Sequence, residues 1–181
     1  MNNLSIIVSS TRPERVGAHV TRWVNETLGA DWDVTILDLA EINLPFLDEP
    51  RMAGTGVYAQ PHTLAWKDQI DAADAIIVVN PEYNGFFPAP IKNAIDFLFA
   101  EWENKPFAIV GYGFGGGARS AGALTTLLEN VKAHVVGSMG LFFNQDLALN
   151  GELSITDGKP EELKALSQQL KAALDAQRQA A

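Results

Sequence analysis

Residues 9–17, with the sequence SSTRPERVG, combine the groups that bind a phosphate. Three hydroxyls and the guanidinium groups of Arg12 and Arg15 can all donate hydrogen bonds to a dianion. A helix expected to start at Val16 adds free backbone N–H groups and the positive end of its dipole. The predicted phosphate site comprises Ser10, Thr11, Arg12, Arg15, Val16 and Gly17. The alternative is that a hydroxyl of Ser10 or Thr11 only caps this helix.

Composition and charge narrow the kind of phosphate site. The chain lacks the G-x-x-x-x-G-K-[ST] pattern of a nucleotide P-loop. It has no cysteine, which excludes a cysteine phosphatase, disulfides, thiolate metal sites and iron–sulfur clusters. A net charge of −9 and a pI near 4.7 oppose binding to nucleic acids and to anionic membranes. An anion must therefore be bound by a local positive site.

Residues 80–93, NPEYNGFFPAPIKN, follow the apolar run AIIVV and are typical of a binding loop. Pro81 and Gly85 are expected to shape its backbone, so that the N–H groups of residues 82–84 point outward. These groups could donate to the polar edge of a planar ring, and Tyr83 could cover one ring face.

Three side chains of this loop have less specific predictions. The Glu82 carboxylate is expected to be solvated, because the backbone can bind a ring whatever the side chain. Phe86 and Phe87 are equally compatible with a subunit contact and with a ligand contact.

Residues 111–120, GYGFGGGARS, contain a G-x-G-x-x-G pattern. A dinucleotide fingerprint also needs an acidic residue about 20 positions further on, and the sequence there, AHVVGSMGLFF, has none. The pattern is therefore interpreted as a loop that lets the backbone approach a ring closely. Its candidate contacts are Gly113, Phe114, Gly115 and Gly116.

Alternating apolar runs and helical patterns predict the elements that position these loops. The expected strands are residues 4–8, 34–37, 75–79, 107–110 and 135–143. The expected helices are residues 16–28, 61–73, 90–98, 121–131 and 160–176. Near-continuous apolar strands indicate a parallel sheet covered on both faces. We expect an α/β fold, a flavodoxin-like doubly wound sheet of five strands in the order 2-1-3-4-5, with residues 1–181 forming a single domain.

In such a sheet the loops after strands one, three and four meet at one edge. Together they suit a ligand with a phosphate at one end and a flat, polar-edged ring at the other. A mononucleotide such as FMN fits this description.

Two connections are longer than usual. Residues 40–60 are expected to form a mobile lid, a dimer arm or a partly ordered excursion. Residues 144–157, with Asn150–Gly151, predict a small hairpin-like extension.

No segment has the roughly 18 apolar residues of a membrane span. We expect a soluble, cytoplasmic protein.

Three stretches of the sequence, SSTRPERVG, NPEYNGFFPAPIKNAIDF and KPFAIVGYGFGGGARSAGAL, resemble the NADPH-dependent FMN reductase family. This flavodoxin-like family includes quinone, azo-dye and chromate reductases. The resemblance implies a bound FMN, with its phosphate at Ser10, Thr11, Arg12, Arg15 and the following helix start. It places the isoalloxazine edge at the backbone of Pro81, Glu82, Tyr83, Asn84 and Gly85, and residues 113–116 over the pyrimidine side. It also implies a homodimer or homotetramer.

The resemblance implies a ping-pong reaction. Hydride passes from NADPH or NADH to the flavin N5, and electrons then pass to a small acceptor such as a quinone or a flavin. No catalytic acid or base and no metal is expected. One rival is a flavodoxin-type electron carrier that does not itself oxidise NAD(P)H. Another is a flavin-free hydrolase using Ser10 or Ser120, which the absence of a histidine from the three loops disfavours.

Overall fold

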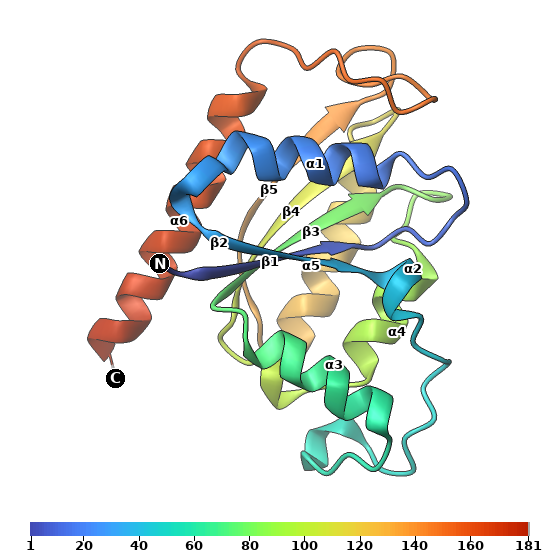
Figure 1. The fold of residues 1–181 in the computed structure, drawn as a ribbon, viewed down its shortest axis with the longest axis vertical. Coiled ribbons are helices and arrows are strands. Elements are labelled where there is room, and N and C mark those ends of the chain that lie inside the picture. The colour runs from blue at the N-terminus through green and yellow to red at the C-terminus, as the bar shows by residue number, and fades with distance from the viewer. Residues whose placement is uncertain (181) are drawn as a thin grey trace.

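The computed structural model describes residues 1–180, and its centre is a five-stranded parallel sheet of the order β2-β1-β3-β4-β5. The strands are β1 (Asn3–Val8), β2 (Asp33–Asp38), β3 (Ala75–Pro81), β4 (Pro106–Gly113) and β5 (His134–Phe142). The predicted fold class and strand order are confirmed. Because all strands run the same way, their carboxyl ends lie along one edge (Figure 1).

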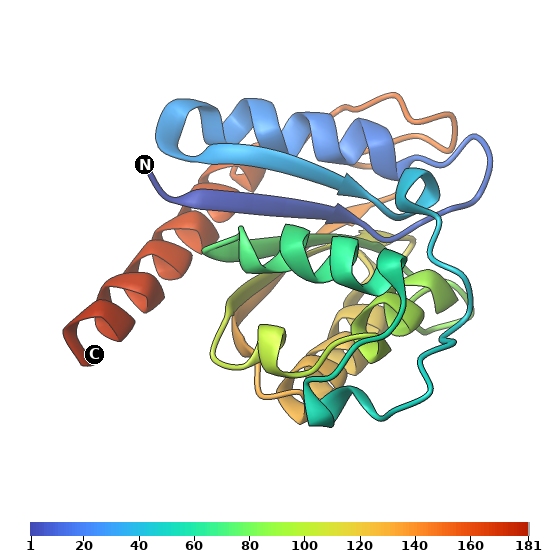
Figure 2. The same cartoon turned by 60° about the horizontal axis from the view of Figure 1, so that its bottom comes forward.

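Helices cover both faces of the sheet. They are α1 (Gly17–Leu28), α2 (Leu39–Ile42), α3 (Pro61–Asp71), α4 (Ala89–Asp96), α5 (Ala118–Asn130) and α6 (Lys159–Ala180). Figure 2 shows α1 on one side of the sheet and α3, α4 and α5 on the other. The long α6 packs against β4, β5 and α1. The five expected helices are all present, and their ends differ from the predicted ones by a few residues.

Alternating side chains of the strands supply two separate cores. In β3, Ile77 and Val79 belong to the cluster under α1 and α6, whereas Ile76 and Val78 belong to the cluster under α3, α4 and α5. This two-sided burial explains why β3 is a continuous apolar run in the sequence. It fixes the strand that carries the central loop of the site.

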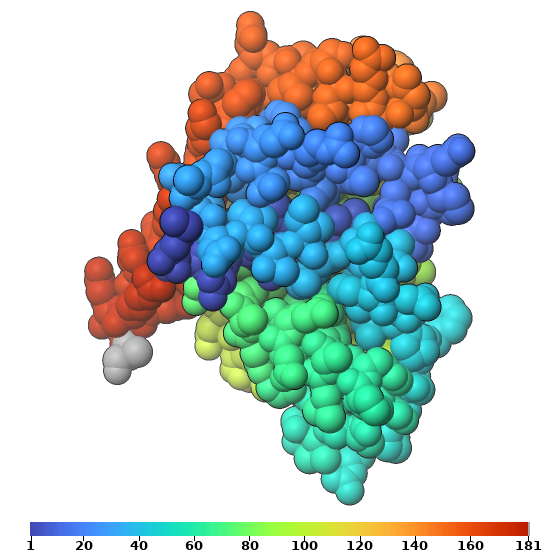
Figure 3. All heavy atoms as spheres, viewed as in Figure 1, coloured from blue at the N-terminus to red at the C-terminus, as the bar shows by residue number. Residues whose placement is uncertain are grey.

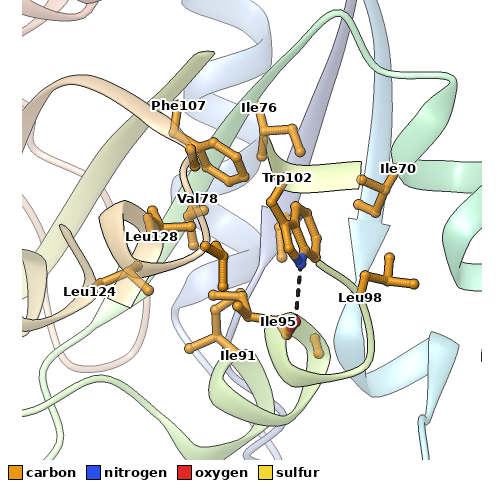
Figure 4. Packing of buried hydrophobic residues seen from close by; sticks show 14 of the residues in the cluster. Ile70, Ile76, Val78, Ile91, Ile95, Leu98, Trp102, Phe107, Leu124 and Leu128 are labelled. Carbon is orange, nitrogen blue, oxygen red and sulfur yellow. Dashed lines mark hydrogen bonds between the residues drawn. The ribbon is translucent and has the colours of Figure 1, made fainter. Parts of the chain in front are cut away.

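Two tryptophans anchor the second core. Trp66 of α3 and Trp102 are almost fully buried, and their ring centroids are 6.2 Å apart. Each indole N–H finds a backbone acceptor on α4, Trp66 at the oxygen of Ala94 (2.9 Å) and Trp102 at the oxygen of Ile95 (3.0 Å, Figure 4). These bonds hold α4, and with it the end of the loop after β3.

The segment from residue 43 to residue 60 is pinned to its surroundings. Asn93 of α4 donates to the oxygen of Pro45 (2.7 Å) and accepts from the N–H of Leu47 (3.0 Å). Glu49 accepts from two N–H groups at the start of α3. The segment runs along the outside of the molecule between α2 and α3 (Figure 3). Phe46 and Met52 remain more than 80% exposed.

The extension after β5 contains the predicted turn, because the N–H of Ala148 donates to the oxygen of Glu152 (2.8 Å) across Asn150 and Gly151. Asp146, 1% exposed, holds the extension together. Its carboxylate accepts from Thr156 and from the N–H of Phe142. Within residues 1–180, no helix is both long and apolar enough to cross a bilayer.

Candidate active site

The three loops singled out in the sequence meet at the carboxyl edge of the sheet. They follow β1, β3 and β4, which are neighbours in the sheet. We call residues 9–16 the phosphate loop, residues 82–88 the ring loop and residues 114–117 the glycine loop.

A buried amide joins the elements that carry these loops. Asn80, which is 0% exposed, accepts a hydrogen bond from Ser9 Oγ (3.1 Å) and donates one to Ser120 Oγ (2.7 Å). Ser9 shares its single hydrogen between Asn80 and the oxygen of Val79 (2.9 Å), and Ser120 donates to the oxygen of Pro81 (2.9 Å). Sequence reasoning did not predict this network, which fixes the ends of β1 and β3 and the start of α5 relative to one another.

The phosphate loop presents an uncapped helix. Helix α1 begins at Gly17, and within residues 1–180 no side chain forms a capping hydrogen bond at its N-cap, Val16. The alternative that Ser10 or Thr11 only caps this helix is therefore wrong. Ser10 is buried, and its Oγ lies 2.6 Å from the Tyr83 hydroxyl of the ring loop. Thr11 and Arg12 are exposed.

The two arginines of the phosphate loop have different surroundings. Arg15 pairs with Asp38 at the end of β2, and Asp38 also caps α2 through the N–H of Ala40 (3.0 Å). The Arg15 Nε is buried and has no hydrogen-bond partner in the described part of the chain. Arg12 has no ion pair with any residue from 1 to 180. Its full positive charge is therefore available to a ligand.

Tyr112, near the end of β4, lies beneath the start of α1. It is 3% exposed, and its hydroxyl has no hydrogen-bond partner within residues 1–180. A Cβ added at Gly17 would lie 3.0 Å from this hydroxyl. Sequence reasoning missed Tyr112, because nothing in the local pattern shows where a strand side chain ends.

The ring loop folds as a tight turn. The N–H of Tyr83 donates to the oxygen of Phe86 (2.9 Å), and the N–H of Phe86 donates back (3.0 Å). Asn84 and Gly85 have φ of 53° and 78°, as in a type I′ turn. The N–H of Glu82 donates to the oxygen of Tyr112 (3.1 Å). The expectation that the N–H groups of Glu82 and Tyr83 point outward is thus wrong, because the turn and β4 use them.

The sequence led us to expect a solvated carboxylate at Glu82. This expectation is wrong, because Glu82 caps α5. Its Oε2 accepts from the N–H groups of Arg119 (3.2 Å) and Ser120 (3.4 Å). The site edge therefore has two helix starts of opposite character. The start of α5 already holds a carboxylate, whereas the start of α1 holds no side chain.

Arg119 is a second residue that sequence reasoning missed. A Cβ added at Gly85 would lie 2.5 Å from the Arg119 Cζ, so the guanidinium packs directly against this glycine. Arg119 is exposed, and no ion pair of residues 1–180 includes it. A free cation thus borders the ring loop.

One glycine of the glycine loop, Gly116, is needed for packing within the fold. Gly116 has a φ of 64°, and an added Cβ would lie 2.8 Å from the Phe142 ring. Gly115 has open space around it, and Phe114 is 71% exposed. Gly116 is thus required by the fold itself, and only residues 114 and 115 are open to a ligand without steric hindrance.

A cleft of about 540 Å³ adjoins the phosphate loop at Thr11. Its walls come from residues 39–46 and from the start of α4, and they include Pro45, Phe46 and Pro90. A volume of this size is within the range of small-molecule sites. The sequence did not predict the cleft, because its walls are distant in the chain.

The structure offers no basis for a serine hydrolase. The Ser10 hydroxyl contacts a tyrosine, and the Ser120 hydroxyl contacts Asn80 and the oxygen of Pro81. Neither serine has a histidine as a hydrogen-bond partner among residues 1–180. No group of three potential metal-binding side chains occurs in that same range.

A parallel sheet of this order, with an open helix start after β1, defines a flavodoxin-like protein whose carboxyl edge can take an anion. A solved structure of this fold is the flavoenzyme NAD(P)H:(acceptor) oxidoreductase FerB from Paracoccus denitrificans. It superposes with a TM-score of 0.67 at 23% identity, covering 97% of this chain and 96% of the other.

The sequence profile of the NADPH-dependent FMN reductase family matches residues 2–148, and the chain belongs to this family. It is 38% identical to an NAD(P)H-dependent FMN reductase of Schizosaccharomyces pombe over 139 residues, covering 74% of this chain and 69% of the relative. It is 32% identical to a quinone reductase of Pseudomonas putida over 116 residues, covering 60% and 58% of the two chains.

The protein is therefore an NAD(P)H-dependent oxidoreductase that uses FMN. The family relationship confirms the enzyme and disfavours the electron carrier that the sequence had left open. The phosphate loop fits the phosphate of FMN, because its free groups are donors and a phosphate dianion only accepts. The buried Nε of Arg15 is the clearest of these unused donors.

Proposed function

We propose that the protein binds FMN across the three loops and reduces a small acceptor, a quinone or a flavin, with NADPH or NADH. The observation that carries this placement is the contrast between the two helix starts at the site edge. The start of α1 has no side-chain cap, whereas Glu82 already caps α5. An anion is therefore favoured at α1 and repelled at α5.

Ser10, Thr11 and Arg12, the Nε of Arg15 and the N–H groups at Val16 and Gly17 would hold the phosphate. The loop is suited to this role because Arg12 is unpaired and Ser10 is fixed by the Asn80 network through its neighbour Ser9. Charge-assisted bonds of this kind are the strong ones in phosphate recognition.

Pro81, Asn84 and Gly85 of the β3 end and the ring loop would contact the ring, together with Phe114 and Gly115 of the glycine loop. The turn leaves the N–H groups of Asn84 and Gly85 outside its two internal hydrogen bonds. Those two groups can donate to the polar edge of the ring. Glu82 and Tyr83 contribute by shaping the turn, Glu82 through α5 and Tyr83 through Ser10.

When bound, FMN supplies the two-electron chemistry. The chain's part is orientation: the turn fixes the ring contacts, the buried network keeps the loops in register, and the free Arg119 cation attracts anionic substrates. No side chain is required as an acid or a base. Donor and acceptor use the same exposed edge in turn, which corresponds to a ping-pong scheme.

The assembly and the cellular location complete the proposal. Phe86 is 54% exposed and packs against Phe87 with centroids 4.5 Å apart and ring planes tilted by 43°, and this exposed aromatic pair supports a homodimer or homotetramer contact beside the site. Size-exclusion chromatography with light scattering checks the oligomer. We propose a cytoplasmic location from the absence of cysteine, with fractionation of cells as its check.

Arg12→Ala tests the phosphate placement. Flavin-free protein is titrated with FMN and with riboflavin, which lacks the phosphate. We expect the Kd for FMN to rise about tenfold or more, because a hydrogen bond to a charged group is lost, and the Kd for riboflavin to stay the same. Arg22→Ala is the matched control, since Arg22 is an exposed arginine on α1 further from its start. Unchanged FMN affinity in Arg12→Ala would show that the phosphate binds elsewhere.

A further inference from the structure

The Tyr112 hydroxyl forms no hydrogen bond within residues 1–180 that would stabilise the fold. It is buried without a hydrogen-bond partner in the part of the chain that the structure describes. Such a group costs free energy relative to an apolar one of the same shape, and phenylalanine would fill the same space. The presence of this hydroxyl therefore calls for an explanation.

The hydroxyl lies directly under the phosphate loop. Gly17, the first residue of α1, leaves room for it, since an added Cβ would lie only 3.0 Å from the oxygen. Burial raises the pKa of the Tyr112 phenol and the nearby Tyr83 adds to the rise, whereas the adjacent Ser10 hydroxyl and the positive charges of Arg15 and Arg12 oppose it. The polar groups near this phenol thus come from the phosphate loop and, at Tyr83, from the ring loop. At neutral pH the hydroxyl keeps its hydrogen and can donate it.

Ser10 has one hydrogen to donate and two lone pairs that accept. Its Oγ now lies 2.6 Å from the Tyr83 hydroxyl, and either group can be the donor there. A phosphate dianion only accepts, so Ser10 has to direct its single hydrogen to the phosphate. The two lone pairs of Ser10 are then free for two phenols, Tyr83 and Tyr112.

We propose that Tyr112 is a positioning residue of the phosphate site. It donates to Ser10 Oγ, and with Tyr83 as the other donor it directs the Ser10 hydrogen outward to the phosphate. Tyr112 acts through Ser10 and needs no contact with the cofactor. The inference rests on the proposed function, which places the FMN phosphate at the phosphate loop.

Tyr112→Phe removes the oxygen and keeps the ring. In the flavin-free full chain, we expect the Kd for FMN to rise about fivefold to tenfold, as for the loss of one hydrogen bond, with the Kd for riboflavin unchanged. The thermal midpoint should stay equal or rise, because an unpaired buried hydroxyl is gone. Thr21→Val is the matched control, since Thr21 of α1 also has a buried hydroxyl without a partner in residues 1–180. It should leave both Kd values unchanged.

Gly17→Ala provides a second variant that does not remove the hydroxyl. Its Cβ would displace the Tyr112 oxygen, so the FMN affinity should fall in the wild type. In the Tyr112→Phe background the oxygen is absent, and Gly17→Ala should cost less there. Contacting residues show this kind of non-additivity in a double-mutant cycle.

The comparison of ligands separates failure of the inference from failure of the proposed site. If Tyr112→Phe leaves FMN binding unchanged, or weakens FMN and riboflavin equally, Tyr112 has only a structural role and the inference is overturned. In that case Arg12→Ala still lowers FMN affinity selectively when the site is correct. If neither variant changes the ratio of the two Kd values, the phosphate is not at this loop and both proposals fail.

Discussion

Replacing Asn80 with alanine removes the amide that joins the three site segments. The variant loses one bond from Ser9 Oγ (3.1 Å) and one to Ser120 Oγ (2.7 Å). Both serines keep their bonds to backbone oxygens, so no hydroxyl becomes unpaired. The loss is about 1 kcal/mol for each hydrogen bond and about 1 kcal/mol for the small cavity, or about 3 kcal/mol in total.

For a chain of this size, that free energy corresponds to a fall of about 6 to 12 °C in the thermal midpoint. Circular dichroism of the flavin-free protein measures it. Asn93→Ala is the matched control, because Asn93 also makes two hydrogen bonds but is only partly buried. Water replaces its partners, so its midpoint should fall by less than about 3 °C. Equal falls in the thermal midpoints of the two variants would refute the reasoning, since burial would then not determine how much an amide side chain stabilises the fold.

Two further predictions concern acid stability and kinetics. Burial raises the pKa of Asp146, but hydrogen bonds from Thr156 and Phe142 outweigh it and hold that pKa below its usual value. The ionised Asp146 therefore stabilises the wild type above about pH 4, and this stabilisation is lost as the pH falls through the lowered pKa. The difference between the urea midpoints at pH 7 and at about pH 3 should be smaller in Asp146→Asn than in the wild type. For the ping-pong scheme, initial rates with NADPH and a quinone should give parallel double-reciprocal lines, and intersecting lines would contradict it.

The fold was predictable because strands that are buried on both faces have continuous apolar sequences. A strand such as β3 is apolar at every position from Ala75 to Val79, which few other structures require. The topology and the edge where loops meet then follow from general rules for parallel sheets. The edge strand β2 is more exposed than the apolar pattern of residues 34–37 indicates, since it has a neighbour on one side only.

The polar contacts of the site were not predictable in the same way. Arg15 and Asp38, or Glu82 and the start of α5, are distant in sequence and meet only after the sheet has formed. One missed feature did have a local signal, because Asn84–Gly85 is a typical type I′ dipeptide and indicates that the flanking N–H groups are used in a turn. Tyr112 had no such signal.

The carboxylate of Glu82 acts as a built-in anion at the head of α5. Consequently, of the two helix starts at this edge, the start of α1 can attract an anion from solution and the start of α5 cannot. A second nucleotide that visits the edge after the first must rely on surface cations such as Arg119 and on its ring, both of which hold a ligand less firmly. Loose holding favours rapid departure, which the proposed ping-pong scheme requires because its two substrates would use this edge in turn.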